Sequence, residues 1–190
     1  MKTLLCTMLV LAACATTTER LGLPDLKTEE RVELPRYLGT WFEIASFPQR
    51  FQKGCTGTTA TYALRPDGDI DVVNRCRLHA LDGPEKVARG HAVVTEPSTN
   101  AKLKVTFFKP FWGEYWIVEV GPEYEYAVVG HPGREYLWIL SRSSTMDAAT
   151  YDGIVQRLRE QGYETARLQK TLQPENVVAD LQGLTRGQPR

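Results

Sequence analysis

The stretch RYLGTWFEIASFPQRF, residues 36–51, places a tryptophan two residues after a glycine, at the start of a run that is apolar on both faces. A strand with one face in water alternates apolar and polar residues, so the lack of alternation predicts a strand covered on both sides. The same strand-like texture continues from Leu34 to about Arg142. Other parts of this sheet must therefore cover Trp41.

Eight strand-like runs follow one another, and short segments rich in Gly, Pro and Asp separate them. Strands at this spacing, with no helices between them, are typical of an antiparallel sandwich or barrel. A closed sheet has no exposed edges, so runs that are apolar on both faces favour closure. We predict an all-β, eight-stranded antiparallel up-and-down barrel, with strands over 40–47, 58–64, 69–77, 86–95, 102–108, 114–120, 124–130 and 136–141.

One helix follows the strands. Ser144-x-x-Asp147 resembles a capping box, and Gly162 supplies a stop. Between them an apolar stripe recurs at helical spacing, and we expect it to pack against the outside of the sheet. A short ninth strand is expected over 167–172, so that the barrel domain spans 34–173 and a polar tail spans 174–190. The stripe consists of Tyr151, Ile154, Val155 and Leu158.

The first residues predict export and lipid attachment. Residues 1–13 carry Lys2 and a short apolar run, typical of a signal peptide and about half the ~20 residues that span a bilayer. Leu11-Ala12-Ala13-Cys14 resembles the bacterial lipobox, which implies diacylglycerol and palmitate on Cys14. Ala15 favours sorting to the outer membrane, on its periplasmic side. Residues 14–33 are then a lipidated N-terminus and flexible tether; an ordinary signal peptide that contains a cysteine is the alternative.

Two cysteines remain after export, Cys55 and Cys76. A hairpin folded about Pro66-Asp67-Gly68 places them nearly opposite each other, in a chain bound for an oxidising compartment. We therefore expect a disulfide, with two free thiols or metal ligation as the alternatives. His79 lies nearby, but two cysteines and one histidine do not make a convincing zinc site.

The composition and the motifs narrow the classes of function that this chain could have. The 190 residues suit one domain, and 23 basic residues balance 23 acidic ones, so no basic surface for nucleic acid is indicated. The sequence contains no nucleophile elbow, zinc-protease motif, P-loop or dinucleotide fingerprint. We expect no enzyme, no metal and no cofactor.

Three short motifs carry a family resemblance. Gly39-Thr40-Trp41, followed by FEIASFP, resembles the G-x-W motif of the lipocalins. YAVVG at 126–130 and YLWILSR, which ends at Arg142, resemble their second and third motifs. With the lipobox ahead and the helix behind, the chain is similar over about 34–172 to the bacterial outer-membrane lipoprotein lipocalins (the Blc type), themselves similar to apolipoprotein D.

The resemblance implies roles for these motif residues. In this family the Trp of the first motif plugs the closed end of the barrel, and the Arg before the helix lies across its ring. Gly39, Trp41 and Arg142 are therefore expected to be structural, with a cation–π contact between the last two. The alternative for Trp41 is an aromatic that stacks on a ligand.

The resemblance also implies a binding site inside the barrel. We expect reversible binding of a fatty acid or lysophospholipid, for lipid storage or transport in envelope maintenance. A tetrapyrrole or other flat hydrophobe, a lipocalin-type isomerase, and a filled barrel without ligand are the alternatives; a homodimer is left open. On the sixth strand, the inward parity rests on Glu119 alone. The residues expected to face the ligand are Ala60, Tyr62, Ala92, Val94, Leu103, Val105, Phe107, Trp116, Val118, Trp138 and Leu140.

Overall fold

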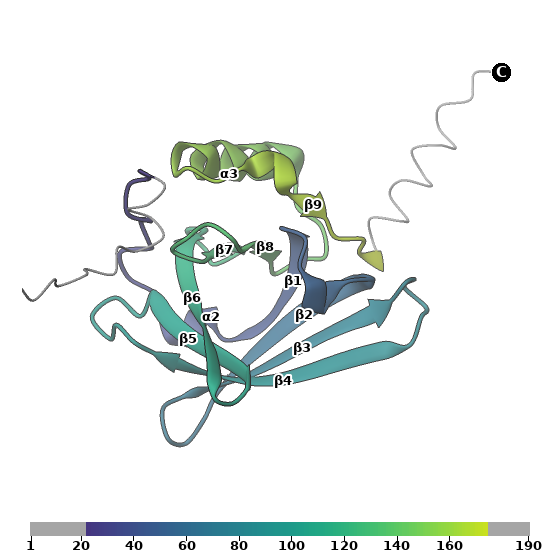
Figure 1. Cartoon of the computed structure of the whole chain (residues 1–190), viewed down its shortest axis with the longest axis horizontal. Coiled ribbons are helices and arrows are strands. Elements are labelled where there is room, and N and C mark those ends of the chain that lie inside the picture. Colours follow the sequence, from purple (N-terminus) through teal and green to yellow (C-terminus); the bar gives the residue numbers. More distant parts are fainter. Residues whose placement is uncertain (1–21, 175–190) are drawn as a thin grey trace, which may run out of the picture.

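The computed structural model describes residues 22–174. They form a closed antiparallel barrel of eight strands, with one short extra strand and one longer helix outside it (Figure 1). The prediction of an eight-stranded up-and-down barrel is confirmed. The strands are β1 (Gly39–Ser46), β2 (Cys55–Leu64), β3 (Ile70–Leu78), β4 (Glu85–Val94), β5 (Lys102–Phe108), β6 (Phe111–Val120), β7 (Tyr126–Gly130), β8 (Leu137–Ser141) and β9 (Gln169–Lys170).

The up-and-down connectivity gives the barrel two different ends. Each strand pairs with its neighbours in sequence, and β1 pairs with both β2 and β8, which closes the sheet. The β1–β2, β3–β4, β5–β6 and β7–β8 connections therefore share one end, which we call the open end. The other connections share the closed end with the short helix α2 (Leu34–Tyr37), which precedes β1.

The C-terminal segment completes the barrel wall near the open end. β1 pairs with β2 only as far as Phe42, and beyond that point β9 pairs with β1 instead. Gln173 is fully buried, and its Nε2 donates to the carbonyl oxygens of Glu43 (2.9 Å) and Thr58 (3.0 Å). The expected ninth strand is therefore present, shorter than 167–172, and the residues around it fill the gap between β1 and β2.

Helix α3 (Ala148–Glu160) lies along the outside of β7 and β8 (Figure 1). Its fully buried Ile154 and Leu158 pack with the outward residues of those strands. The N-cap is Asp147, whose Oδ1 accepts from the Thr150 N–H at 2.9 Å, so the expected cap at Ser144 is wrong. The helix therefore starts three residues later than the motif suggested, and the Asp147 side chain takes the capping role.

The segment before α2 is packed on the barrel. Leu26 and Val32 are buried. The Glu29 N–H donates to the Ile117 carbonyl at 3.0 Å, and the Val32 N–H donates to that of Thr99 at 2.7 Å. In Figure 1 this purple segment runs beside the barrel to α2. The expectation of a flexible tether is therefore wrong for residues 22–33, while the signal peptide and Cys14 lie outside the described residues.

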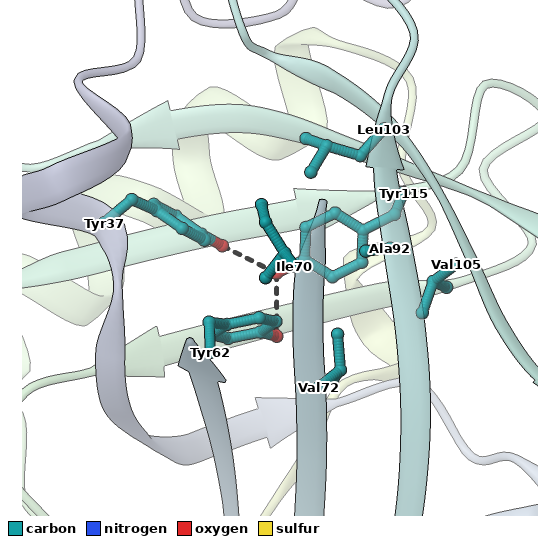
Figure 2. A pocket seen from close by; sticks show the side chains of 8 residues that line it. All are labelled: Tyr37, Tyr62, Ile70, Val72, Ala92, Leu103, Val105 and Tyr115. Carbon is teal, nitrogen blue, oxygen red and sulfur yellow. Dashed lines mark hydrogen bonds between the residues drawn. The ribbon is translucent and has the colours of Figure 1, made fainter. Parts of the chain in front are cut away.

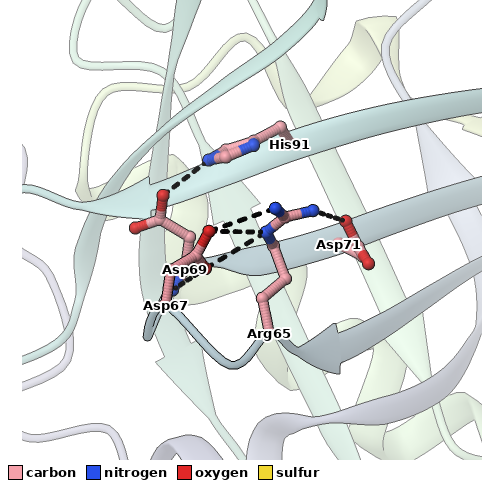
Figure 3. A network of polar contacts seen from close by, with 5 residues as sticks. All are labelled: Arg65, Asp67, Asp69, Asp71 and His91. Carbon is pink, nitrogen blue, oxygen red and sulfur yellow. Dashed lines mark hydrogen bonds and ion pairs between the residues drawn. The ribbon is translucent and has the colours of Figure 1, made fainter.

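Two features hold the hairpin of β2 and β3. Cys55 and Cys76 form the expected disulfide at its open end. At its closed end, Arg65 donates to Asp67 (3.1 Å) and Asp71 (2.8 Å) across the predicted turn (Figure 3). This hairpin is thus fastened at both ends.

No helix within residues 22–174 is long and apolar enough to cross a membrane.

Candidate ligand-binding site

The closed end is plugged by Trp41, whose side chain is fully buried. The guanidinium carbon of Arg142 lies 3.6 Å from the centre of a Trp41 ring, and Trp41 Nε1 donates to the Tyr37 carbonyl at 2.8 Å. Gly39 has a φ of +91°, a conformation that favours glycine, and a Cβ there would contact the Arg142 guanidinium. The structure therefore places the three motif residues as the resemblance implies.

Most of the residues expected to face a ligand do face the barrel interior. Phe107 shares their face, since its ring lies against Gly90, but it stands at the open end and is 45% exposed. Their role as ligand contacts stays a prediction. The eight that belong to the interior cluster are Ala60, Tyr62, Ala92, Val94, Leu103, Val105, Trp138 and Leu140.

The inward assignment of Trp116 and Val118 is wrong. Both belong to the cluster outside the barrel, beneath α3. The pairing of β6 with β7 shifts between Ile117 and Glu119, which marks a β-bulge at this point. Glu119 does face outward, as expected, but the extra residue reverses the alternation before it, so Ile117 and Tyr115 face inward instead.

Three tyrosines occupy the part of the interior that lies next to the closed end. The hydroxyls of Tyr37 and Tyr115 are hydrogen-bonded at 2.6 Å, and that of Tyr115 donates to Tyr62 at 2.9 Å (Figure 2). We call these residues the Tyr triad. Their hydroxyls satisfy one another in an otherwise apolar environment, which buried polar groups require. Tyr37 reaches this position from α2, at the closed end, rather than from a strand.

Burial raises the pKa values of the three hydroxyls in the Tyr triad. Desolvation raises the pKa of Tyr62 to about 12 and holds the pKa values of Tyr37 and Tyr115 well above 10. The triad is therefore neutral at physiological pH and presents hydroxyl groups, not phenolates, to the interior.

We expect the Tyr triad to make the protein less stable in strong alkali. Each phenol of the unfolded chain loses its proton near pH 10. Above that pH the folded state binds more protons than the unfolded state, so the free energy of unfolding falls by up to about 1.4 kcal/mol per pH unit for each tyrosine. Urea unfolding at pH 9 and 11 measures the slope. Tyr62→Phe should flatten it; an unchanged slope in that variant would contradict the assignment.

The interior is closely packed around the Tyr triad. The cavity there holds about 10 Å³, room for roughly one water molecule, so the expected pocket does not reach this part of the barrel. The rings of Tyr37 and Tyr115, which the strand pattern did not reveal, take up the space beside Tyr62. The lining consists of Tyr37, Tyr62, Ile70, Val72, Ala92, Leu103, Val105 and Tyr115 (Figure 2).

Polar side chains cluster in the upper half of the interior, toward the open end. The carboxylate of Glu43, which is 5% exposed, accepts from Gln52 Nε2 at 2.7 Å and from Thr171 Oγ1 at 2.6 Å. Trp138 Nε1 donates to Gln52 Oε1 at 3.1 Å. Asn74 shares this region, and its Oδ1 is buried without a hydrogen-bond partner in the described part of the chain.

The β1–β2 connection crosses the open end. It contains the 3₁₀ turn Arg50–Gln52. Gln52 ties it to inward residues of β1 and β8, while Lys86 Nζ, on β4, donates to the Phe51 carbonyl at 2.7 Å. The interior therefore has one end plugged by Trp41 and one end covered by a short loop held through polar side chains.

Comparisons with known proteins identify the family. The family model of the Lipocalin-like domain matches residues 32–173. Temperature-induced lipocalin-1 of Arabidopsis thaliana is 40% identical over an alignment of 158 residues, which covers 78% of this chain and 83% of that protein. The outer membrane lipoprotein Blc of Vibrio cholerae is 41% identical over 150 residues, 78% and 87% of the two chains.

Solved structures show the same fold. Insecticyanin from the tobacco hornworm Manduca sexta superposes with a TM-score of 0.61 at 20% identity, over 78% of this chain and 85% of that one. Sequence motifs, barrel topology and the family match thus agree. The chain belongs to the lipocalin family.

Proposed function

We propose that this lipocalin binds a fatty acid or lysophospholipid inside the barrel. The observation that carries the proposal is an apolar interior, plugged at one end by Trp41 and covered at the other by a loop. Such an interior suits an acyl chain, whose polar head stays at the entrance. The acyl chain would run toward the Tyr triad.

Binding next to the Tyr triad requires side chains to move, because the cavity there holds about 10 Å³ and ligand pockets commonly hold some hundreds. The groups that cover the entrance are held by three hydrogen bonds. Gln52 accepts from Trp138 and donates to Glu43, and Lys86 donates to the Phe51 carbonyl. Each contributes about 1 kcal/mol net. Displacing them costs little compared with the burial of a long acyl chain, at about 0.8 kcal/mol per CH₂.

The polar groups of the upper interior would meet the ligand head group. Asn74 Oδ1 can accept a hydrogen bond, and Glu43 places a carboxylate in the same region. A ligand carboxylate beside Glu43 would be repelled, whereas an ammonium group would be attracted. A zwitterionic lysophospholipid could place its ammonium group beside Glu43 and its phosphate beside Lys86, whose Nζ donates to the Phe51 carbonyl at this end.

The cellular setting is also a proposal. Relatives from Vibrio cholerae and Escherichia coli are named outer membrane lipoproteins. Together with the lipobox that ends at Cys14, these names support a lipid-anchored protein of the outer membrane. There it would store or carry lipids in envelope maintenance, without catalysis.

We expect a bulky side chain at the entrance to block binding. Ala88 lies opposite Asn74 and faces the interior, while its neighbour Val87 faces outward and is 39% exposed. Ala88→Trp should weaken the binding of a fluorescent fatty acid about tenfold or more, because the indole occupies the path of the acyl chain.

Val87→Trp is the matched control, since it adds the same side chain to the other face of the same strand. It should bind as the unaltered protein does. Thermal melts of both variants establish that they are folded. Equal binding by folded Ala88→Trp, or no displacement at micromolar lipid by the unaltered protein, would contradict the proposal.

A further inference from the structure

The open end carries a group of exposed aromatic side chains. Phe108 and Phe111 are 75% and 72% exposed, whereas buried positions are usual for phenylalanine. Contiguous exposed apolar surface of this kind marks a site of interaction with a protein or a membrane. We call the group the aromatic rim; it consists of Phe51, Phe107, Phe108, Phe111, Trp112 and Tyr136.

The aromatic rim lies on three of the four connections at the open end, β1–β2, β5–β6 and β7–β8. The rings of Phe108 and Phe111 stack at the β5–β6 connection, with centroids 6.3 Å apart. Phe51, on the β1–β2 loop, lies 6.4 Å from Tyr136 of the β7–β8 connection. Within residues 22–174, every large aromatic side chain that is exposed lies toward the open end. Leu64, which is not aromatic, is exposed at the closed end.

Basic side chains stand next to the rim phenylalanines, while Glu135 precedes Tyr136 on the β7–β8 connection. Lys109 lies between Phe108 and Phe111, and two basic residues, Arg50 and Lys53, flank the Phe51 side. Residues 44–66 and 97–113 contain no Asp or Glu. Aromatic rings beside basic side chains match the interface of a bilayer with anionic lipid, where the rings enter the head-group region and the cations meet phosphate.

We propose that the aromatic rim is a membrane-docking surface, which inserts into the head-group and acyl boundary of an anionic bilayer. The entrance of the barrel then opens directly onto lipid. This inference goes beyond binding in the interior, because it assigns a second lipid contact to a different surface.

The start of the described chain supports the same orientation. The Pro24 carbonyl accepts from Arg134 Nη2 at 2.6 Å, and Arg134 belongs to the β7–β8 connection at the open end. Cys14 precedes Gly22 by eight residues, which span at most about 29 Å. A lipid on Cys14, which rests on the proposed function, would thus hold the open end within reach of the membrane.

Quenching by brominated lipid tests the docking surface. The full chain is reconstituted into vesicles of phosphatidylglycerol and phosphatidylethanolamine with brominated acyl chains. Trp112 is 41% exposed on the rim, so its fluorescence should be quenched at least about twofold relative to vesicles without bromine. The quenched component should vanish in Trp112→Phe and weaken in Phe108→Ser/Phe111→Ser.

The matched control moves the reporter to the opposite end. In the Trp112→Phe background, Leu64→Trp places an exposed indole at the closed end, where bromine should not reach it. Equal quenching at both ends, or none at Trp112, would overturn the proposal. The proposal would also be overturned if a second copy of the chain covered the rim. In that case the molar mass would double and the fluorescence of Trp112 would stay unquenched. Fatty-acid displacement reads the interior separately, so failure here leaves that proposal standing.

Discussion

Replacing Trp41 by alanine is expected to lower the free energy of unfolding by about 3–5 kcal/mol. The side chain is fully buried at the closed end, and the interior around it is already closely packed. Its removal leaves a cavity that the barrel wall cannot collapse to fill. It also removes the aromatic face below Arg142, whose guanidinium lies 3.6 Å from the ring centre. Urea denaturation at neutral pH measures the loss.

Trp112→Ala is the matched control for this prediction. It removes the same side chain from a position that is 41% exposed at the open end. A surface substitution of this kind should change stability by less than about 1 kcal/mol. Equal losses at the two positions, or a loss below about 1 kcal/mol for Trp41→Ala, would mean that Trp41 is not the plug of the barrel.

Removing the disulfide has the second-largest expected effect. Cys55 and Cys76 are 21 residues apart, and closing a loop of that length restricts the unfolded chain by about 3 kcal/mol. The variant Cys55→Ala/Cys76→Ala avoids placing a hydroxyl at buried position 76. Its free energy of unfolding should fall by that amount.

Chemical reduction supplies an independent comparison. The unaltered protein in excess dithiothreitol should lose the same stability as the double variant, because both lose the same loop constraint. If the reduced protein and the variant unfold at the same urea concentration as the oxidised protein, this bond contributes nothing to the fold and the prediction is wrong.

The barrel could be predicted from sequence because its signals are local. Turn residues between the runs, such as Pro66-Asp67-Gly68, mark strand ends, and the motif around Trp41 marks the first strand. Pairing in an up-and-down barrel then follows chain order, so the topology needs little long-range information. The disulfide between Cys55 and Cys76 followed from the same hairpin.

The face of the sheet on which a side chain lies could be predicted only where apolar and polar residues alternate along the strand without a break. On β5, Lys104 outside and Leu103 inside gave the correct face. On β6 the bulge before Glu119 reversed the alternation, and no residue type in YWIVEV marks a bulge. Trp116 and Val118 were assigned to the wrong face for this reason.

Contacts made from outside the strands could not be predicted. Tyr37 enters the interior from α2, and its ring fills space that strand parity alone assigns to a ligand. Leu26 and Val32 are isolated apolar residues in a polar segment, so their burial against the barrel has no periodic signal. Such contacts depend on the closed barrel already being present.

The close packing around the Tyr triad changes what ligand binding must involve. A preformed cavity would bind an acyl chain without rearrangement, whereas here the movement of side chains reduces the net affinity. Gln52 and Trp138 at the entrance, and the Tyr triad below, are the groups that a ligand has to displace or contact. Access to the interior thus depends on the loop that carries Gln52.

Native mass spectrometry tests the central claim, that the barrel interior receives one acyl lipid, most directly. The full chain is mixed with lysophosphatidylethanolamine and sprayed from a neutral volatile buffer. We predict one added lipid mass per chain for the unaltered protein and for Val87→Trp, and binding at least about tenfold weaker for folded Ala88→Trp. The claim is contradicted if no mass is added to the unaltered protein, or if Ala88→Trp takes up the lipid equally well.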